Sequence, residues 1–319
     1  MKPLLLVLDD WEGLIAASPC WKEIENIVDI KYLQGPISEA NNADIAAANF
    51  LMAIRERTPL TEKVFARLPR LELVLQTGGH AYHVDINAAR ERGVKIALGR
   101  HVKAPLASVP ELTFAMALGI MHKVPPANAA MHAGKWPLVT GRVLAKKRMG
   151  ILGLGRHGAR VARIARDAFD MDVVAWQRTE AVSNNNSDIP RVSLDELLTT
   201  SDIVSIHLKL SPESTGLMNE GNLKKMKPGA VLINTARGAI IDEVALAGVL
   251  VNGPLSAAGL DVFVHEPLPV DSPLRSLPNV IITPHIGWTV KEVFEEFAQI
   301  ACTQVQHYLQ GSLSADELI

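Results

Sequence analysis

The stretch Arg148–Ala165, RMGILGLGRHGARVARIA, decides the fold of this chain. Its apolar run Met149–Leu152 has the length of a buried strand. The run GLGRHG follows with Gly153, Gly155 and Gly158, and apolar residues then recur at helical spacing. A dinucleotide pyrophosphate requires this order of strand, glycine turn and helix. The glycines permit a tight turn and close packing, and the helix N-terminus faces the negative charge.

Two further residues of this loop, Arg156 and His157, are expected to lie beside the bound pyrophosphate with the three glycines. A glycine turn that binds nothing is the alternative interpretation, because the bare spacing GxGxxG is a weak signal. The strand before the turn and the helix after it favour a dinucleotide site.

Length and composition restrict the class of protein. A chain of 319 residues is too long for one ordinary core and predicts two domains. With 48% hydrophobic and 21% charged residues, it should fold as a globular protein. The formal net charge is -2 and no long basic block occurs, so a nucleic-acid partner is not expected. No apolar run is long enough for a membrane span.

The N-terminus and the cysteines predict a reducing compartment. The apolar run Leu4–Leu8 is followed at once by two acids, which indicates a first strand rather than a signal peptide. Only Cys20 and Cys302 are present, far apart in the sequence, so both should be buried or idle thiols without a disulfide framework. A cytoplasmic location is therefore expected.

The first hundred residues alternate short apolar runs with helical segments such as Leu60–Leu68. This alternation predicts a parallel sheet with helices on both faces. The long helical pattern Pro105–His122 should cross to a second domain, and Met131–Gly141 should be irregular. The strands expected here are Leu4–Leu8, Ile27–Leu33, Phe50–Ile54 and Leu73–Gln76.

From Arg148 onward, strands and helices alternate again, and six strands are the number that a dinucleotide-binding sheet uses. The helical stretch Val290–Leu309 should return the chain to the first domain. We therefore predict two doubly wound parallel-sheet α/β domains. A Rossmann cofactor domain over 101–289 is inserted into a smaller, flavodoxin-like substrate domain formed by 1–100 and 290–319. The six strands are expected at Gly150–Leu152, Val173–Trp176, Ile203–His207, Ala230–Asn234, Ala257–Leu260 and Val280–Thr283.

Three polar residues follow separate strands of the second sheet, at the edge where open parallel sheets bind ligands. They are Arg237, Glu266 and His285. In hydride transfer on a hydroxy acid, an imidazole can take the hydroxyl proton, a carboxylate can orient it, and a guanidinium can hold the substrate carboxylate. Taken singly, each could be a surface ion-pair partner, a loop acid or a local backbone cap. Together, after the glycine turn, they favour a catalytic set.

The chain resembles the D-isomer-specific 2-hydroxyacid dehydrogenase family from about Gln76 to Trp288. The motifs that carry this resemblance are ILGLGRHG, SDIVSIHLKLSPESTGLMN, MKPGAVLINTARGAIIDE, LDVFVHEP and TPHIG. The resemblance implies that His285 is the acid/base, that Glu266 is its partner and that Arg237 binds the substrate.

The same resemblance implies further contacts and an assembly. Asp261 would meet the nicotinamide carboxamide, and the amides of Gly78 and Gly79, in QTGGHAYHVDINAARERG, would hold the substrate carboxylate. A homodimer built on the glycine-turn domain is also implied. Additional cofactor contacts are expected from His207, Thr235 and Ala236.

The chain departs from the usual NAD pattern at the adenosine ribose. An acid is expected about 20 residues after the glycine turn, but Gln177, Arg178 and Thr179 stand there. An acid would bind a free 2′-hydroxyl, whereas Arg178 with Thr179 could bind a 2′-phosphate. NADP is therefore slightly preferred over NAD. The alternative is that Arg178 points to solvent and NAD is used.

Two features bear on the substrate. Arg55 and Arg57 would share one face of an extended segment, similar to one that phosphoglycerate dehydrogenases use, and a second anionic or polar substrate group would fit. A solvated basic face is the alternative. Trp288 would place an indole beside the reacting centre or pack against the hinge. The substrate contacts expected are Arg55, Gly78, Gly79, Arg237, His285 and Trp288.

The leading hypothesis is an NAD(P)-dependent oxidoreductase that interconverts a 2-oxo acid and a D-2-hydroxy acid. The substrate would be of glyoxylate, hydroxypyruvate or phosphoglycerate type. Relatives that act on formate carry Gln where Glu266 stands, which argues against formate. A phosphite dehydrogenase-like enzyme and a dinucleotide-sensing corepressor-like protein would share the same Arg, Glu and His set, so both remain open. No metal site is expected.

Overall fold

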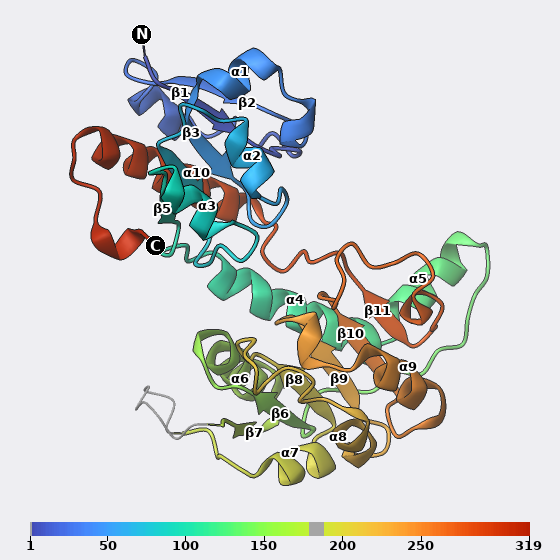
Figure 1. The fold of residues 1–319 in the computed structure, drawn as a ribbon. Helices are drawn as coiled ribbons and strands as arrows, with labels where there is room; N and C mark the ends of the chain where they lie inside the picture. The colour runs from blue at the N-terminus through green and yellow to red at the C-terminus, as the bar shows by residue number, and fades with distance from the viewer. Residues whose placement is uncertain (1, 179–187) are drawn as a thin grey trace. The chain divides into compact units, whose positions relative to one another are not determined.

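The computed structural model describes residues 2–178 and 188–319, and the chain divides into two compact units (Figure 1). The first unit joins Met1–Ala104 to Thr289–Ile319, and the second is the continuous segment Pro105–Trp288. The second unit thus begins with its first helix, at Pro105, rather than at the predicted residue 101. The division of binding roles between the two units stays a prediction.

The first unit is built on a five-stranded parallel sheet in the order β2-β1-β3-β4-β5, which is the flavodoxin-like order. All four residues of β4 are buried, as an interior strand of a sheet covered on both faces requires. The fifth strand was not among those predicted. The strands are β1 (Leu4–Val7), β2 (Asp29–Tyr32), β3 (Ala48–Ala53), β4 (Leu73–Gln76) and β5 (Lys95–Leu98).

Short capped helices connect these strands. Asp85, for example, begins α3 by accepting a hydrogen bond from the amide of Ala88 at 3.0 Å. The long helix α10 belongs to this unit (Figure 1) and packs against η1, where the Cys302 thiol donates to the Cys20 carbonyl at 3.3 Å. Both thiols are free and buried. The helices are η1 (Pro19–Glu23), η2 (Ile37–Glu39), α1 (Asn42–Ala47), α2 (Glu62–Ala66), α3 (Ile86–Glu91), α10 (Lys291–Leu309) and η5 (Ala315–Glu317).

The second unit contains a six-stranded parallel sheet in the order β11-β10-β9-β8-β6-β7. Among the described residues that follow β7, Arg191 forms a parallel bridge with Ala175. With this bridge counted, the order is that of a dinucleotide-binding sheet, with its switch point between β6 and β8. The predicted fold class is confirmed. The strands are β6 (Arg148–Leu152), β7 (Asp172–Trp176), β8 (Ile203–Ile206), β9 (Val231–Asn234), β10 (Ala257–Leu260) and β11 (Val280–Ile282).

Helices on both faces bury this sheet, but one of the unit's helices was missed by the sequence analysis. Helix α5 begins after Lys123, whose φ of 57° ends α4, and prolines in its first turn suit a helix start. Among the described residues, no helix is both long and apolar enough to cross a membrane. The helices are α4 (Pro105–Met121), α5 (Val124–His132), α6 (Arg156–Phe169), α7 (Leu194–Thr200), α8 (Glu220–Lys225), η3 (Gly238–Ile240), α9 (Glu243–Asn252) and η4 (Pro273–Arg275).

Candidate active site

The glycine loop connects β6 to α6 at the switch point of the second sheet. Gly153 has a φ of +97°, and a side chain there would strike the His207 carbonyl after β8. A Cβ on Gly158 would lie 2.0 Å from the Gly153 carbonyl oxygen, so the helix can approach the strand only with glycine at this position. Gly155 caps α6 without a side-chain bond, which leaves the first amides of the helix for an anion. The loop therefore fits a dinucleotide pyrophosphate.

Two histidines lie beside this loop, and burial keeps both neutral. Burial lowers the pKa of His207 to about 3, and nearby His157 adds to the effect. The His207 Nε2 atom is 2.8 Å from the Ser205 hydroxyl. Burial, Arg156 and Arg237 lower the pKa of His157. Neutral imidazoles can donate or accept hydrogen bonds near the pyrophosphate without adding charge.

Gln177 and Arg178, which are expected to lie at the adenosine ribose, directly follow β7. The Arg178 guanidinium is paired with Glu213 at 2.7 Å, and about half of each side chain is exposed. Hydrogen bonds from Ser211 and Arg178 lower the pKa of Glu213 to about 2, so Glu213 is ionised at neutral pH. The sequence analysis did not include this carboxylate. Thr179, a predicted phosphate contact, lies outside the described residues.

Arg237 follows β9 in a turn that Asn234 shapes. The Asn234 side chain accepts from the Ala236 amide at 3.0 Å and donates to the Arg237 carbonyl at 2.9 Å. A Cβ on Gly238 would lie 1.9 Å from the carbonyl carbon of Phe263, so glycine brings the turns after β9 and β10 into contact. This contact brings Arg237 close enough to Glu266 to contribute to lowering its pKa.

His285 and Glu266 form the central pair of the site. The His285 Nδ1 atom donates to Glu266 Oε2 at 2.7 Å, and the amide of Phe263 donates to the other Glu266 oxygen at 2.9 Å. His285 has a φ of 56°, a left-handed conformation that costs a non-glycine residue free energy and often marks a functional position. The bond at Nδ1 fixes the ring and leaves Nε2 on its opposite side.

The titration of Glu266 depends on this pair. Burial acts to raise its pKa, but the hydrogen bond and charge of His285, the Phe263 amide and Arg237 together lower it. The ionised carboxylate therefore stabilises the folded state above the unfolded pKa of about 4.3. That stabilisation is lost as the pH falls through the lower pKa of the folded state.

Asp261 holds the loop that carries His285, a role that the sequence analysis missed. Its Oδ1 atom accepts from the Thr283 hydroxyl at 2.5 Å and the Ile286 amide at 2.8 Å. Its Oδ2 atom accepts from the Gly287 amide at 2.8 Å. Burial raises the pKa of this carboxyl, although the three hydrogen bonds act against the rise. The sequence contained a signal for this role, because Asp261 directly follows β10. That strand lies beside β11, which precedes the His285 loop.

Two predicted cofactor contacts have other partners in the structure. The Thr235 hydroxyl is 3.1 Å from that of Thr113 on α4, and the Ala236 carbonyl accepts from Arg237 Nη1 at 2.6 Å. Trp288 is the last residue of the second unit. No group of three His, Cys, Asp or Glu side chains in residues 2–178 and 188–319 could hold a metal ion.

The remaining predicted contacts lie in the first unit. Arg55 follows β3, and Gly78 and Gly79 follow β4, so all three are at the carboxyl edge of that sheet. Arg57 does not offer a solvated basic face. Its guanidinium binds both Glu12 oxygens, and its side chain is only 9% exposed.

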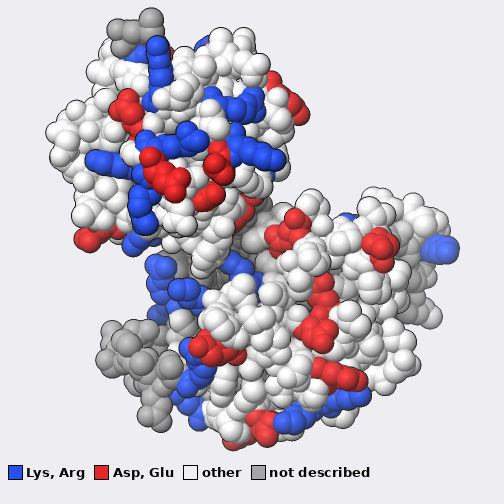
Figure 2. Space-filling view, viewed as in Figure 1, with Lys and Arg blue, Asp and Glu red and all other residues white. Residues whose placement is uncertain are grey.

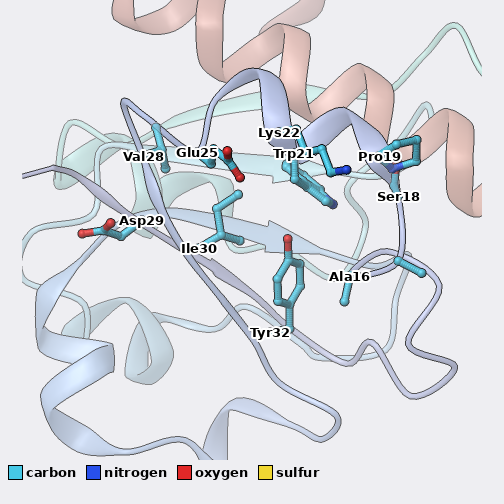
Figure 3. A pocket seen from close by; sticks show the side chains of 11 residues that line it. Ala16, Ser18, Pro19, Trp21, Lys22, Glu25, Val28, Asp29, Ile30 and Tyr32 are labelled. Atoms are coloured by element: carbon cyan, nitrogen blue, oxygen red, sulfur yellow. The ribbon is translucent and has the colours of Figure 1, made fainter.

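A shallow cavity of about 510 Å³ lies elsewhere in this unit, beside the edge strand β2. Figure 3 shows its lining, with Tyr32 directed toward Trp21 across the cavity. The ring centres of these two side chains are 6.3 Å apart. It contains none of the predicted site residues, so we do not assign the chemistry to it.

Comparisons with known proteins identify the family of this chain. Residues 114–287 match the NAD binding domain model of the D-isomer specific 2-hydroxyacid dehydrogenases. The chain is 35% identical to a hydroxypyruvate reductase from Blautia hydrogenotrophica over 95% of this chain and 93% of that protein. It is also 35% identical to a D-3-phosphoglycerate dehydrogenase from Mycobacterium tuberculosis, but it covers only 54% of that protein's length.

A solved structure indicates the same family. A D-lactate dehydrogenase from Aquifex aeolicus, complexed with NAD and lactic acid, superposes with a TM-score of 0.80 at 26% identity. The match covers 99% of this chain and 98% of that one. The chain therefore belongs to the D-isomer specific 2-hydroxyacid dehydrogenase family, NAD-dependent oxidoreductases that interconvert 2-oxo acids and 2-hydroxy acids.

Proposed function

We propose that this chain reduces a small 2-oxo acid of the glyoxylate or hydroxypyruvate type to the D-2-hydroxy acid. The observation that carries the proposal is the 2.7 Å bond between His285 and Glu266 at the ends of neighbouring strands. The His285 imidazolium, which Glu266 stabilises before the reaction, gives its Nε2 proton to the substrate oxygen and becomes a neutral imidazole. Arg237 polarises the same oxygen. The bound nicotinamide supplies the hydride.

A phosphoglycerate-type substrate is the second candidate, because D-3-phosphoglycerate dehydrogenases are among the relatives. The chain spans about half of the M. tuberculosis phosphoglycerate dehydrogenase. One observation favours the unphosphorylated class, because the Arg57 side chain is already bound to Glu12.

A panel assay tests the proposal. The purified protein is mixed with NADH or NADPH and with glyoxylate, hydroxypyruvate, pyruvate or 3-phosphohydroxypyruvate, and separately with NAD⁺ or NADP⁺ and phosphite, and the nicotinamide absorbance is followed. Turnover of the first two supports the proposal. Tight cofactor binding without turnover of any 2-oxo acid would favour the corepressor-like alternative, and oxidation of phosphite alone would favour the phosphite dehydrogenase-like one.

We infer that the protein uses NADP as well as NAD, with a slight preference for NADP. Support comes from the absence of an acid at Gln177 and from the half-exposed guanidinium of Arg178 at the end of β7. The 2′-phosphate would have to compete with Glu213 for this guanidinium.

Replacing Arg178 with alanine should weaken NADPH binding about tenfold and NADH binding less than twofold, because only NADPH carries the charge that Arg178 would contact. Titration calorimetry with each cofactor measures both constants. Glu213→Gln is the matched variant and should strengthen NADPH binding alone. Equal losses for both cofactors in Arg178→Ala would contradict the 2′-phosphate role.

We further propose a cytoplasmic homodimer without a nucleic-acid partner. Figure 2 shows lysine and arginine side chains interspersed with acidic ones on one face of the first unit, which does not suit a phosphate backbone.

An exposed apolar surface follows α5 in the second unit, where Trp136 is 83% and Leu138 is 98% exposed.

This surface is the proposed dimer contact. Leu138→Asp should therefore convert a dimer to a monomer in light scattering coupled to size exclusion. Val270→Asp serves as the control, because Val270 is 91% exposed in a different loop. A wild-type monomer, or a dimer that survives Leu138→Asp, would contradict this contact.

A further inference from the structure

We propose that Glu56 is a specificity-determining residue that neutralises Arg55. In this assignment, the first unit accepts 2-oxo acids whose far end is small and uncharged and discriminates against phosphorylated ones. The inference rests on the proposed 2-oxo acid reduction and names the substrate class of that reaction.

Arg55 is held rigidly at the carboxyl edge of the first sheet. It lies two residues after the end of β3 in a left-handed conformation, with a φ of 54°. Its amide donates to the Thr77 hydroxyl at 2.7 Å, and its carbonyl accepts from the Gln76 side chain at 3.2 Å. Such a conformation persists only where neighbouring groups fix it. The side chain of Arg55 is therefore presented from a fixed backbone.

The guanidinium lies against the Gly78 backbone, where the substrate carboxylate is expected. A Cβ on Gly78 would come within 2.0 Å of Arg55 Nη1, so the position has room for the guanidinium only as glycine. This proximity makes Arg55 the nearest described cation to the proposed carboxylate site in the first unit. Its charge therefore influences which substrates can bind.

Glu56 offsets that charge. Its Oε1 atom lies 3.5 Å from Arg55 Nη2 and 3.2 Å from His80 Nε2, and the Arg55 and His80 nitrogens are 3.3 Å apart. The side chains of Arg55 and His80 are 14% and 18% exposed, so solvent screens the cluster only in part. The His80 ring stacks on Tyr82 with 4.4 Å between ring centres, and this stacking holds His80 in place beside Glu56.

The second arginine of the segment is neutralised in the same way. Arg57 binds Glu12 through both terminal nitrogens and also donates to the Asp9 carbonyl at 2.8 Å. Its guanidinium lies over the Trp11 ring, 4.4 Å from the centre. The two cations of this segment, Arg55 and Arg57, are therefore paired with the carboxylates of Glu56 and Glu12. A dianionic phosphate would have to displace or face Glu56, whereas a hydroxymethyl group or a hydrogen would not.

Glu56→Gln tests the assignment, because it removes the negative charge and keeps the shape. Rates are measured with hydroxypyruvate and 3-phosphohydroxypyruvate at one fixed pH. Both compounds carry the same 2-oxo carboxylate, so the ratio of their kcat/KM values isolates the far group. We expect the wild type to prefer hydroxypyruvate. The variant should raise kcat/KM for the phosphorylated compound about tenfold, equivalent to ~1.4 kcal/mol, and change the other less than twofold.

Glu62→Gln is the control, because Glu62 is exposed on α2 in the same unit and the substitution changes the net charge equally. It should leave the ratio unchanged. Titration calorimetry with D-glycerate and 3-phospho-D-glycerate provides a second readout that needs no turnover. If no 2-oxo acid is reduced, the proposed function fails and the calorimetric ratio alone decides the role of Glu56. A wild type that prefers the phosphorylated compound, or a ratio that Glu56→Gln does not move, overturns the assignment.

Discussion

Replacing His285 with alanine should lower kcat/KM for the preferred 2-oxo acid by about a thousandfold, within the range that a general acid contributes. The imidazole is the proposed proton donor, and Glu266 holds it in place through a 2.7 Å bond. NADH binding should stay within about threefold of the wild type, because the glycine loop lies on other strands of the sheet. Steady-state kinetics and calorimetric titration of NADH measure the two effects separately.

His265→Ala is the control for this experiment. His265 is an exposed histidine next to Glu266 in the sequence. It should retain nearly full activity. Glu266→Gln should fall between the two variants, since an amide still accepts the bond from His285 but cannot balance an imidazolium. Retention of more than a tenth of the activity in His285→Ala would show that another group donates the proton.

The glycine loop and the pairing of His285 with Glu266 could be predicted, the loop from a local motif and the pairing from the order of the strands. Gly158 is required by its contact with Gly153 inside one strand-turn-helix unit, and Gly153 by its φ of +97° in the turn, so both leave a fixed spacing in the sequence. His285 and Glu266 follow strands of a sheet whose order is known once the fold is known. Their approach to 2.7 Å then follows from the topology.

The partners of the charged residues could not be predicted, because they come from elements far apart in the sequence. Arg178 pairs with Glu213, which lies beyond β8, and Arg57 pairs with Glu12, which follows β1. The sequence analysis treated these arginines as open positive charges. Which carboxylate reaches them depends on side-chain packing, and no periodicity or motif records it.

Helix α5 was missed for a simpler reason, since its prolines are strong breakers anywhere but in a first turn.

Replacing Asp261 with asparagine should disturb the hydrogen bonds that hold the His285 loop. Both of its oxygens accept hydrogen bonds, three in all, from the loop that carries His285. In Asp261→Asn one oxygen becomes an amide nitrogen, which must face a backbone or hydroxyl donor at the same position. A buried donor without an acceptor costs about 1–3 kcal/mol. We therefore expect a loss of that size in the free energy of unfolding and a fall in kcat of at least tenfold.

The fall in kcat distinguishes a positioning role of Asp261 from a loss of stability alone. Asp202→Asn is the control variant for this distinction. Asp202 also accepts a backbone amide, from Arg148 at 2.9 Å, and pairs with Lys227 at 2.8 Å. It precedes β8, at the amino edge of the same sheet, opposite the edge that carries His285. Denaturant unfolding should show both variants destabilised, while kcat should fall only in Asp261→Asn. Equal kcat values in the two variants would mean that the His285 loop keeps its geometry without Asp261. In that case the strained φ of 56° at His285 must be held by the bond to Glu266.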